Sequence, residues 1–224
     1  MNILFIYFSS EYRPRTLLSL SIIETIAQED GHSTSIFDTS FYQSYLSPDE
    51  VNVYKSGILK EATNIEIPLK TSDPLDDLRQ KIEEVQPQLI AFSFYLNHIE
   101  IQRELLTEVK KNYPDIKIVA GGSQCILNPT MSIQETYIDM ICYGEGEILF
   151  KNLLRKLDAG EDLKTIRGLW LKNDDGSVHE SEITELTPVD SIPIQNWDSY
   201  DPIQINGLYN GRAYRMGHVE FTRG

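Results

Sequence analysis

The stretch that decides the fold, residues 87–123, reads PQLIAFSFYLNHIEIQRELLTEVKKNYPDIKIVAGGS. It starts with a mostly apolar stretch at 88–94, continues with apolar residues at helical spacing from Ile101 to Val109, and ends with a second mostly apolar stretch at 116–120. Short stretches of this kind are typical of strands buried on both faces. A strand, a helix and a strand in this order predict one right-handed crossover unit of a parallel sheet.

The same alternation continues on both sides of this unit. Further strands are predicted at 2–8, 32–38 and 138–142, and further helices around Leu18, Ile22 and Ile26, from Asp73-Pro74 onward, and through Leu149 or Phe150, Leu153 and Leu157. Asp73 can cap the helix that Pro74 begins. The pattern therefore predicts an α/β fold, a doubly wound five-stranded parallel sheet, over about residues 1–160. Residues 39–72 interrupt it as an insertion, with one helix expected after Ser47-Pro48.

The chain after residue 160 has a different pattern. Residues 167–172 and 177–183 flank an Asn-Asp-Asp-Gly turn, which predicts a small β-hairpin extension. Residues 187–200 are rich in Pro, Asp and Ser and indicate a linker, followed by a tight turn at 209–212 and a strand that begins at 219–222. We expect three parts: a domain at 1–160, a hairpin extension at 161–186, and a linker with the start of another domain at 187–224.

The charge balance excludes some classes of partner. The chain has 224 residues, and its 20 Lys and Arg against 34 Asp and Glu give a net charge of −14. This balance argues against binding to nucleic acid or to an anionic membrane, both of which need clustered cations. No apolar run approaches ~18 residues, so no transmembrane helix is predicted. With no signal-peptide pattern at the start and only two cysteines, Cys125 and Cys142, a cytoplasmic protein with reduced, buried thiols is expected.

Ligands of open α/β sheets bind outside the carboxyl ends of the strands, where this chain carries four polar or glycine-bearing loops. A receiver domain is excluded because no Asp ends the first or third strand, and a flavodoxin because residues 9–16 lack glycine. A P-loop motif is also missing, and Gly144-x-Gly146 follows the last strand rather than the first. What remains is a pair of glycine turns, at 121–122 and 144–147. They either admit a long ligand between them or are only tight strand-to-helix turns.

Several motifs, in this order, resemble the cobalamin (B12)-binding domain of class B radical S-adenosylmethionine (SAM) enzymes. They are Ile3-Leu-Phe-Ile-Tyr7, Ser19-Leu-Ser-Ile-Ile-Glu-Thr-Ile-Ala-Gln-Glu-Asp-Gly-His32, Asp38, Pro87-x-Leu-Ile-Ala-Phe-Ser93, Ile118-Val-Ala-Gly-Gly-Ser123, Ile141-Cys-Tyr-Gly-Glu-Gly-Glu147 and Ile166-Arg-Gly-Leu-Trp170. In that family, a phrase like residues 219–224 comes just before the Cys-x-x-x-Cys-x-x-Cys segment that holds a [4Fe–4S] cluster. The resemblance implies a flavodoxin-like fold of the cobalamin-binding type, in a chain that stops just short of that segment.

By this resemblance the ligand is cobalamin, and its nucleotide tail descends between the loops. The cofactor-binding residues would be Ser9, Ser10, Ser93, Phe94, Tyr95, Leu96, Asn97, Gly121, Gly122, Ser123, Gly144, Glu145, Gly146 and Glu147. The loop after the first strand has no His, which implies a base-off corrinoid without a protein imidazole on cobalt. His32 is interpreted as a turn residue, and His98 as a helix-start residue or, alternatively, a cobalt ligand. Glu145 either lines the site or caps the following helix.

The resemblance also implies a role within a longer enzyme. There the corrinoid would carry methyl groups or electrons, as in a methyltransferase, and a C-terminal radical SAM domain in cis would supply the [4Fe–4S] cluster and S-adenosylmethionine. This chain alone would bind cobalamin without turnover, and we assign it no catalytic residue and no metal ligand. Two alternatives stay open: a corrinoid-free scaffold or protein-interaction domain, and a flavin- or nucleotide-binding α/β module.

Overall fold

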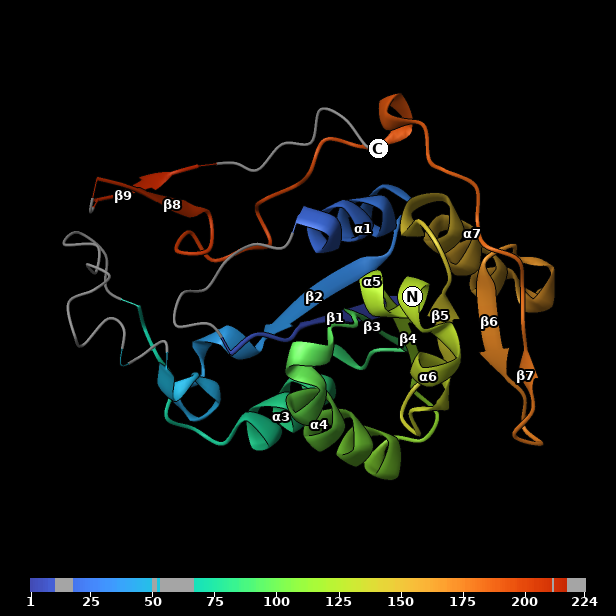
Figure 1. Cartoon of the computed structure of the whole chain (residues 1–224), viewed down its shortest axis with the longest axis horizontal. Coiled ribbons are helices and arrows are strands. Elements are labelled where there is room, and N and C mark those ends of the chain that lie inside the picture. Colours follow the sequence, from blue (N-terminus) through green and yellow to red (C-terminus); the bar gives the residue numbers. More distant parts are fainter. Residues whose placement is uncertain (11–17, 50–51, 53–66, 211, 217–224) are drawn as a thin grey trace.

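The computed structural model describes residues 1–10, 18–49, 52, 67–210 and 212–216. Its main sheet has seven strands in the order β2-β1-β3-β4-β5-β6-β7 (Figure 1). The first five strands of this order are parallel, and they are β1 (Asn2–Tyr7), β2 (Ser33–Asp38), β3 (Leu89–Ser93), β4 (Lys117–Gly121) and β5 (Met140–Cys142). The predicted five-stranded parallel sheet is confirmed.

Helices cover both faces of this sheet, as a doubly wound fold requires (Figure 1). One face carries α1 (Leu18–Glu29) and α7 (Gly146–Ala159), which contact each other. The other face carries α3 (Pro74–Val85) and α4 (Ile99–Asn112), together with the short helices α5 (Ser123–Leu127) and α6 (Pro129–Gln134). Single-turn 3₁₀ helices lie at Thr39–Phe41, Gln43–Tyr45, Leu96–His98, Leu163–Thr165 and Val189–Ser191.

Two apolar cores follow from the alternation of side chains along the strands. In β1, Ile3 and Phe5 belong to the core under α1 and α7, whereas Leu4 and Ile6 belong to the core under α3 and α4. All four side chains are almost completely buried. This two-sided burial explains why the strand is an unbroken apolar run rather than an alternating one.

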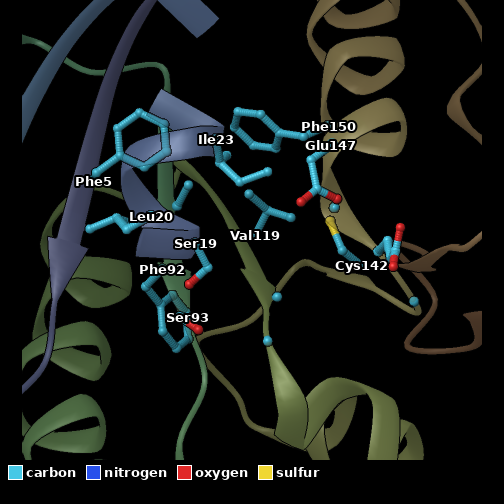
Figure 2. A pocket seen from close by; sticks show the side chains of 16 residues that line it. Phe5, Ser19, Leu20, Ile23, Phe92, Ser93, Val119, Cys142, Glu147 and Phe150 are labelled. Carbon is cyan, nitrogen blue, oxygen red and sulfur yellow. The ribbon is translucent and has the colours of Figure 1, made fainter. Parts of the chain in front are cut away.

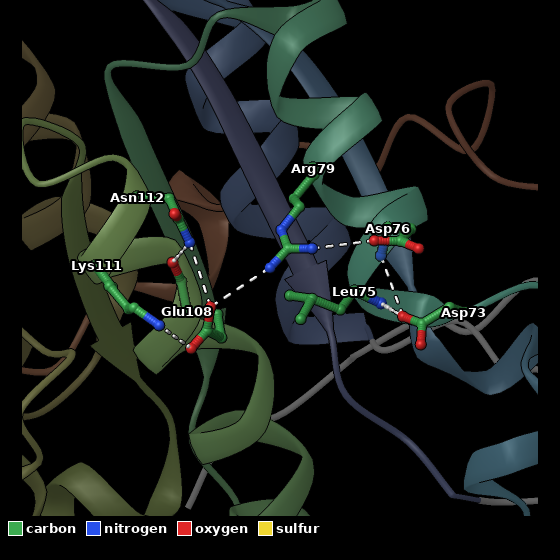
Figure 3. A network of polar contacts seen from close by, with 7 residues as sticks. All are labelled: Asp73, Leu75, Asp76, Arg79, Glu108, Lys111 and Asn112. Atoms are coloured by element: carbon green, nitrogen blue, oxygen red, sulfur yellow. Dashed lines mark hydrogen bonds and ion pairs between the residues drawn. The ribbon is translucent and has the colours of Figure 1, made fainter.

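The start of α3 agrees with its prediction from Asp73-Pro74. The Asp73 carboxylate accepts hydrogen bonds from the backbone N–H groups of Leu75, at 2.8 Å, and Asp76, at 3.2 Å (Figure 3). Arg79 then reaches from α3 to α4, with ion pairs to Asp76 at 3.0 Å and to Glu108 at 3.4 Å (Figure 3). These ion pairs are solvent-exposed, so packing of the apolar faces contributes more to stability than they do.

The hairpin extension is present, and it continues the main sheet. Strand β6 (Leu169–Lys172) pairs antiparallel with β5, and β7 (Val178–His179) pairs antiparallel with β6. Gly176 occupies the turn at φ 81°. The second strand is much shorter than the predicted 177–183, because the chain then turns toward α7, and the N–H of Thr184 donates to the Tyr143 carbonyl at 3.1 Å.

Residues 187–205, called the strap below, lie against α1 and the end of β2. The N–H of Asn196 donates to Thr25 Oγ1 at 2.9 Å, and the Asn196 side chain donates to Gln28 Oε1 at 2.9 Å. Farther along, the Gln204 amide donates to the Asp38 carboxylate. The strap is therefore attached to the main domain at Asn196 and Gln204, whereas Ile194, two residues before Asn196, is exposed.

A second, two-stranded sheet follows, formed by β8 (Asn206–Tyr209) and β9 (Arg212–Arg215). It confirms the predicted turn at 209–212, where Asn210 has φ 49°. The strand predicted at 219–222 lies outside the described residues, as does most of the helix predicted after Ser47-Pro48. Among the described residues, no helix combines the length and the apolar character needed to cross a bilayer.

Candidate functional site

A pocket of about 180 Å³ opens at the carboxyl ends of β3, β4 and β5, on the face covered by α1 and α7 (Figure 2). In the sheet, β2 lies on one side of β1 and β3 lies on the other, so the strand order reverses between β1 and β3. The pocket adjoins this topological switch point. Its lining consists of Phe5, Ser19, Leu20, Ile23, Ala91, Phe92, Ser93, Val119, Gly121, Gly122, Cys142, Gly144, Glu145, Gly146, Glu147 and Phe150.

Most of the wall is apolar. Phe5 comes from β1, Leu20 and Ile23 from α1, Val119 from β4 and Phe150 from α7, and Figure 2 shows them around one space. An apolar cavity of ~150 Å³ is large enough for a benzene ring. The pocket therefore has room for one flat aromatic group.

Glycines let two loops approach the pocket closely. Gly122 has φ 90°, and a Cβ there would overlap Ser93 Oγ and lie 3.4 Å from the Phe94 nitrogen. Gly144 has φ 118°, and a Cβ there would overlap the Thr184 side chain. Residues with a side chain rarely adopt these backbone conformations, and a Cβ at either position would overlap a neighbouring side chain. Both positions therefore need glycine for two independent reasons. Both turns are therefore tight, and both line the pocket.

Two carboxylates, with the hydroxyls of Ser19 and Ser93, form the polar part of the wall. Glu147, in the first turn of α7, is 8 % exposed, and its carboxylate points into the space between Ile23, Val119 and Cys142 (Figure 2). Thr187 of the strap contacts both acids. Its hydroxyl donates to Glu147 Oε2 at 3.5 Å, and its backbone N–H donates to Glu145 Oε2. Glu145 occupies the N-cap position of α7, as one of its two interpretations expects, but its side chain makes no capping hydrogen bond there.

Seven of the predicted site residues lie in this lining. They are Ser93, Gly121, Gly122, Gly144, Glu145, Gly146 and Glu147. The other lining residues lie in strands and helices rather than in the loops at the strand ends, and they were not predicted: Phe5, Ser19, Leu20, Ile23, Ala91, Phe92, Val119, Cys142 and Phe150. A usable signal existed for three of them: Phe5, Ala91 and Val119 alternate onto the same face of neighbouring strands.

Ser9 and Ser10 are not in the pocket lining. The N–H of Ser9 donates to Thr39 Oγ1 at 2.8 Å, and the Thr39 hydroxyl donates back to the Ser9 carbonyl at 3.0 Å. The Ser10 carbonyl accepts from the N–H of Ser47 at 3.0 Å. These contacts hold both serines against the segment that follows β2.

The remaining predicted residues lie beside the pocket rather than in it. Phe94 is fully buried in the core under α3 and α4. Tyr95, Leu96 and Asn97 form the loop between β3 and α4, and Leu96 is 46 % exposed. Ser123 begins α5, directly after the pocket glycines. This loop and Ser123 follow the ends of β3 and β4, so they belong to the edge of the sheet at which the pocket opens.

Neither candidate histidine lines the pocket. His32 is buried, and its Nδ1 lies 3.2 Å from the amino terminus and 3.7 Å from Asp158, which fits the predicted turn role. His98 precedes α4 as its N-terminal flanking residue. In the described part of the chain, no group of three His, Cys, Asp or Glu side chains is arranged to hold a metal ion.

Both cysteines are buried thiols, as predicted. Burial raises the pKa of Cys125 to about 12 and raises that of Cys142 as well. The Cys125 thiol also donates to the Gly121 carbonyl at 3.5 Å. Both groups are therefore protonated at neutral pH, and Cys142 adds a neutral surface to the pocket.

Residues 53–154 match the protein family described as "B12 binding domain". The uncharacterized methyltransferase PH0819 of Pyrococcus horikoshii is 25 % identical over 174 residues, which cover 76 % of this chain and 37 % of that protein. The cobalamin-dependent radical SAM methyltransferase TokK of Streptomyces tokunonensis is 30 % identical over 90 residues, which cover 39 % of this chain and 13 % of TokK.

Solved structures with the same fold include two radical S-adenosylmethionine enzymes with cobalamin bound. OxsB, with aqua-cobalamin and S-adenosylmethionine bound, superposes with a TM-score of 0.62 at 15 % identity, over 88 % of this chain and 24 % of OxsB. TsrM from Kitasatospora setae, with cobalamin and a [4Fe–4S] cluster bound, superposes with a TM-score of 0.58 at 15 % identity, over 91 % of this chain and 32 % of TsrM.

Proposed function

Since this chain contains a B12-binding domain, we propose that it holds cobalamin at the carboxyl ends of β3, β4 and β5, with the nucleotide tail in the pocket. The observation that carries this proposal is the apolar pocket of about 180 Å³ beside the switch point of the sheet. Its volume suits the flat aromatic base of the tail, whereas the much larger corrin ring would lie outside it.

The residues around the pocket mouth fit a corrin ring. The exposed Leu96 and its neighbour Tyr95 offer apolar surface for the lower face of the ring. The hydroxyls of Ser93 and Ser123 and the amide of Asn97 can hydrogen-bond to the tail or to the corrin amides. With an apolar lower face and no His in the lining, the domain would hold cobalamin base-off, and bound cobalamin would supply the methyl- or electron-transfer chemistry.

The chain would act as one part of a longer enzyme. It spans about a third of the length of the relative PH0819 and less of TokK. We propose the division expected from the sequence, with cobalamin bound by residues 1–160, a hairpin extension at 161–186, and residues 187–224 leading into a radical SAM domain in cis. That domain would hold the [4Fe–4S] cluster and S-adenosylmethionine, and the whole protein would be a methyltransferase, as the names of PH0819 and TokK suggest.

Reconstitution with hydroxocobalamin tests this proposal. The purified chain would be incubated with the corrinoid and desalted, and its visible spectrum recorded. We expect retained cobalamin with a base-off spectrum. A spectrum typical of nitrogen ligation would contradict the base-off assignment and point to His98.

A parallel incubation with flavin mononucleotide and with nucleotides tests the alternatives. Retention of a yellow flavin, or thermal stabilisation by nucleotides and not by cobalamin, would show that the domain binds a flavin or a nucleotide instead of cobalamin. A folded chain that retains none of these ligands would act as a corrinoid-free scaffold.

A further inference from the structure

The sheet side of the pocket consists of two rows of residues, one behind the other. The outer row lies at the carboxyl ends of the strands and is formed by Ser93 of β3, Gly121 of β4 and Cys142 of β5. Ser93 pairs with Gly121, and a Cβ on Gly121 would lie 3.8 Å from the Cys142 Cβ. The outer row therefore presents a hydroxyl, a glycine backbone and a thiol.

The inner row lies two residues farther from the carboxyl ends of the same strands. Phe5 of β1 pairs with Ala91 of β3, and Ala91 pairs with Val119 of β4. Residues two apart along a strand share one face of the sheet, so the inner row continues the surface of the outer row. Ala91 is the smallest of the three side chains and lies between the other two. The inner row therefore has a notch at Ala91.

Apolar side chains from two helices cover the inner row. Leu20 and Ile23 come from α1, and Phe150 comes from α7. Figure 2 shows them around one space with Phe5 and Val119. The rings of Phe5 and Phe150 lie 6.0 Å apart, measured between their centroids. This end of the pocket therefore suits an apolar group small enough to enter the notch.

The nucleotide base of cobalamin has such a group at one end. The base is a dimethylbenzimidazole, and a nitrogen of its five-membered ring is bonded to the ribose. The two methyl groups lie at the opposite end of the base, on the six-membered ring. With the ribose at the outer row, the methyl groups point toward the inner row.

We propose that the notch at Ala91 receives the methyl groups of the base, so that Ala91 selects corrinoids by the size of their nucleotide base. This inference rests on the proposed function, because it requires the tail in the pocket. Ala91 is a specificity-determining residue, since its small side chain leaves the room that the methyl groups fill. The preferred ligand is a corrinoid with a dimethyl-substituted benzimidazole rather than an unsubstituted one.

The first test compares two corrinoids on the unmodified chain. Cyanocobalamin and its analogue with an unsubstituted benzimidazole differ by two methyl groups. Burial of each methyl group strengthens binding about fourfold, so the chain should prefer cyanocobalamin by about fifteenfold. Equilibrium dialysis measures both dissociation constants. Equal constants would overturn the selection by Ala91 and leave the proposed function standing.

Ala91→Val tests the notch itself, because valine adds two methyl groups where those of the base would lie. Overpacking of this kind should weaken the binding of cyanocobalamin by about tenfold or more. The smaller analogue should lose less affinity, so the preference for cyanocobalamin should disappear. The cost of removing each base from cobalt is the same with both proteins, and it cancels in this comparison.

Ala120→Val is the matched control. Ala120 follows Val119 in β4, is fully buried, and belongs to the core under α3 and α4, on the other face of the sheet. The same increase in volume there should leave the preference for cyanocobalamin unchanged. The comparison of the two corrinoids on the unmodified chain is independent of whether either variant folds.

The adverse outcomes separate the inference from the proposed function. An equal loss of affinity for both corrinoids in Ala91→Val would overturn the role of Ala91 alone. Cyanocobinamide has no nucleotide base, so an affinity equal to that of cyanocobalamin would remove the tail from the pocket and overturn the inference. A chain that retains no corrinoid would overturn the proposed function, and the inference with it.

Discussion

At the scale of single residues, two glycines with nearly the same positive φ differ in what surrounds them. Gly31 has φ 88° and Gly122 has φ 90°, and both values strain any other residue. A Cβ on Gly31 would meet nothing within 4 Å, whereas a Cβ on Gly122 would overlap Ser93 Oγ. A side chain at Gly31 therefore has only the cost of a positive φ, whereas a side chain at Gly122 has that cost and the overlap with Ser93.

Gly122→Ala should therefore destabilise the chain and block the pocket. We expect a loss of about 2–4 kcal/mol in the free energy of unfolding, from backbone strain and overlap together, and no retention of cobalamin. Gly31→Ala should lose only about 1–2 kcal/mol and retain cobalamin. Urea denaturation and desalting after reconstitution measure both quantities. Equal effects of the two variants would show that the space beside Ser93 has no role.

At the scale of elements, the strap depends on buried carboxylates for its attachment. Asp38, at the end of β2, accepts hydrogen bonds from Ser40 and from Gln204 of the strap. Burial raises its pKa to about 6, because these hydrogen bonds do not fully replace water. Burial also raises the pKa of Glu24 on α1, whose carboxylate accepts from Thr34 at 2.9 Å.

The raised pKa of Asp38 predicts a dependence of stability on pH. Between about pH 4 and about pH 6, the folded chain keeps the Asp38 proton while the unfolded chain releases it. The stabilisation is therefore complete below this range and is lost as the pH rises through it, by about 2–3 kcal/mol. Asp38→Asn should remove this contribution, so the difference in unfolding free energy between variant and wild type should change over the same range. A constant difference across the range would contradict the raised pKa.

The strap and the pocket mark what the sequence can and cannot predict. Local patterns were sufficient for the sheet, because apolar runs, the Asp73-Pro74 start and the Asn-Asp-Asp-Gly turn each act over a few residues. The contacts of the strap could not be predicted, because its partners, Thr25 and Asp38, lie far away in the sequence. The loops at the strand ends pointed to Gly122 and Glu147, but the wall residues Phe5 and Phe150 become neighbours only once the strands pair.

At the scale of the whole molecule, the pocket joins elements from both ends of the domain. Its walls come from β1 and α1, from the central strands β3 to β5, and from α7. A ligand that contacts all of them stabilises the folded state as a unit, because it binds that state and not the unfolded chain.

Cobalamin should therefore raise the melting temperature. At a concentration about a hundredfold above the dissociation constant, the gain is about 2.7 kcal/mol, which corresponds to a shift of about 5–10 °C. Circular dichroism with and without cobalamin measures this shift, and cobinamide should give a smaller one. An unchanged melting temperature in the presence of retained cobalamin would show that the cofactor binds the unfolded chain as well as the folded one, which contradicts a site assembled from these elements.

The hairpin that continues the sheet also affects solubility. Without β6, strand β5 would present unpaired N–H and C=O groups along a parallel edge, which is a template for pairing with another chain. The edge that β6 and β7 leave instead is a strand of two residues, Val178 and His179, flanked by the acidic residues Asp174, Asp175, Glu180 and Glu182. An edge strand this short has few backbone N–H and C=O groups for another strand to pair with, and the acidic residues beside it repel other acidic chains. The hairpin thereby protects the folded chain from aggregation.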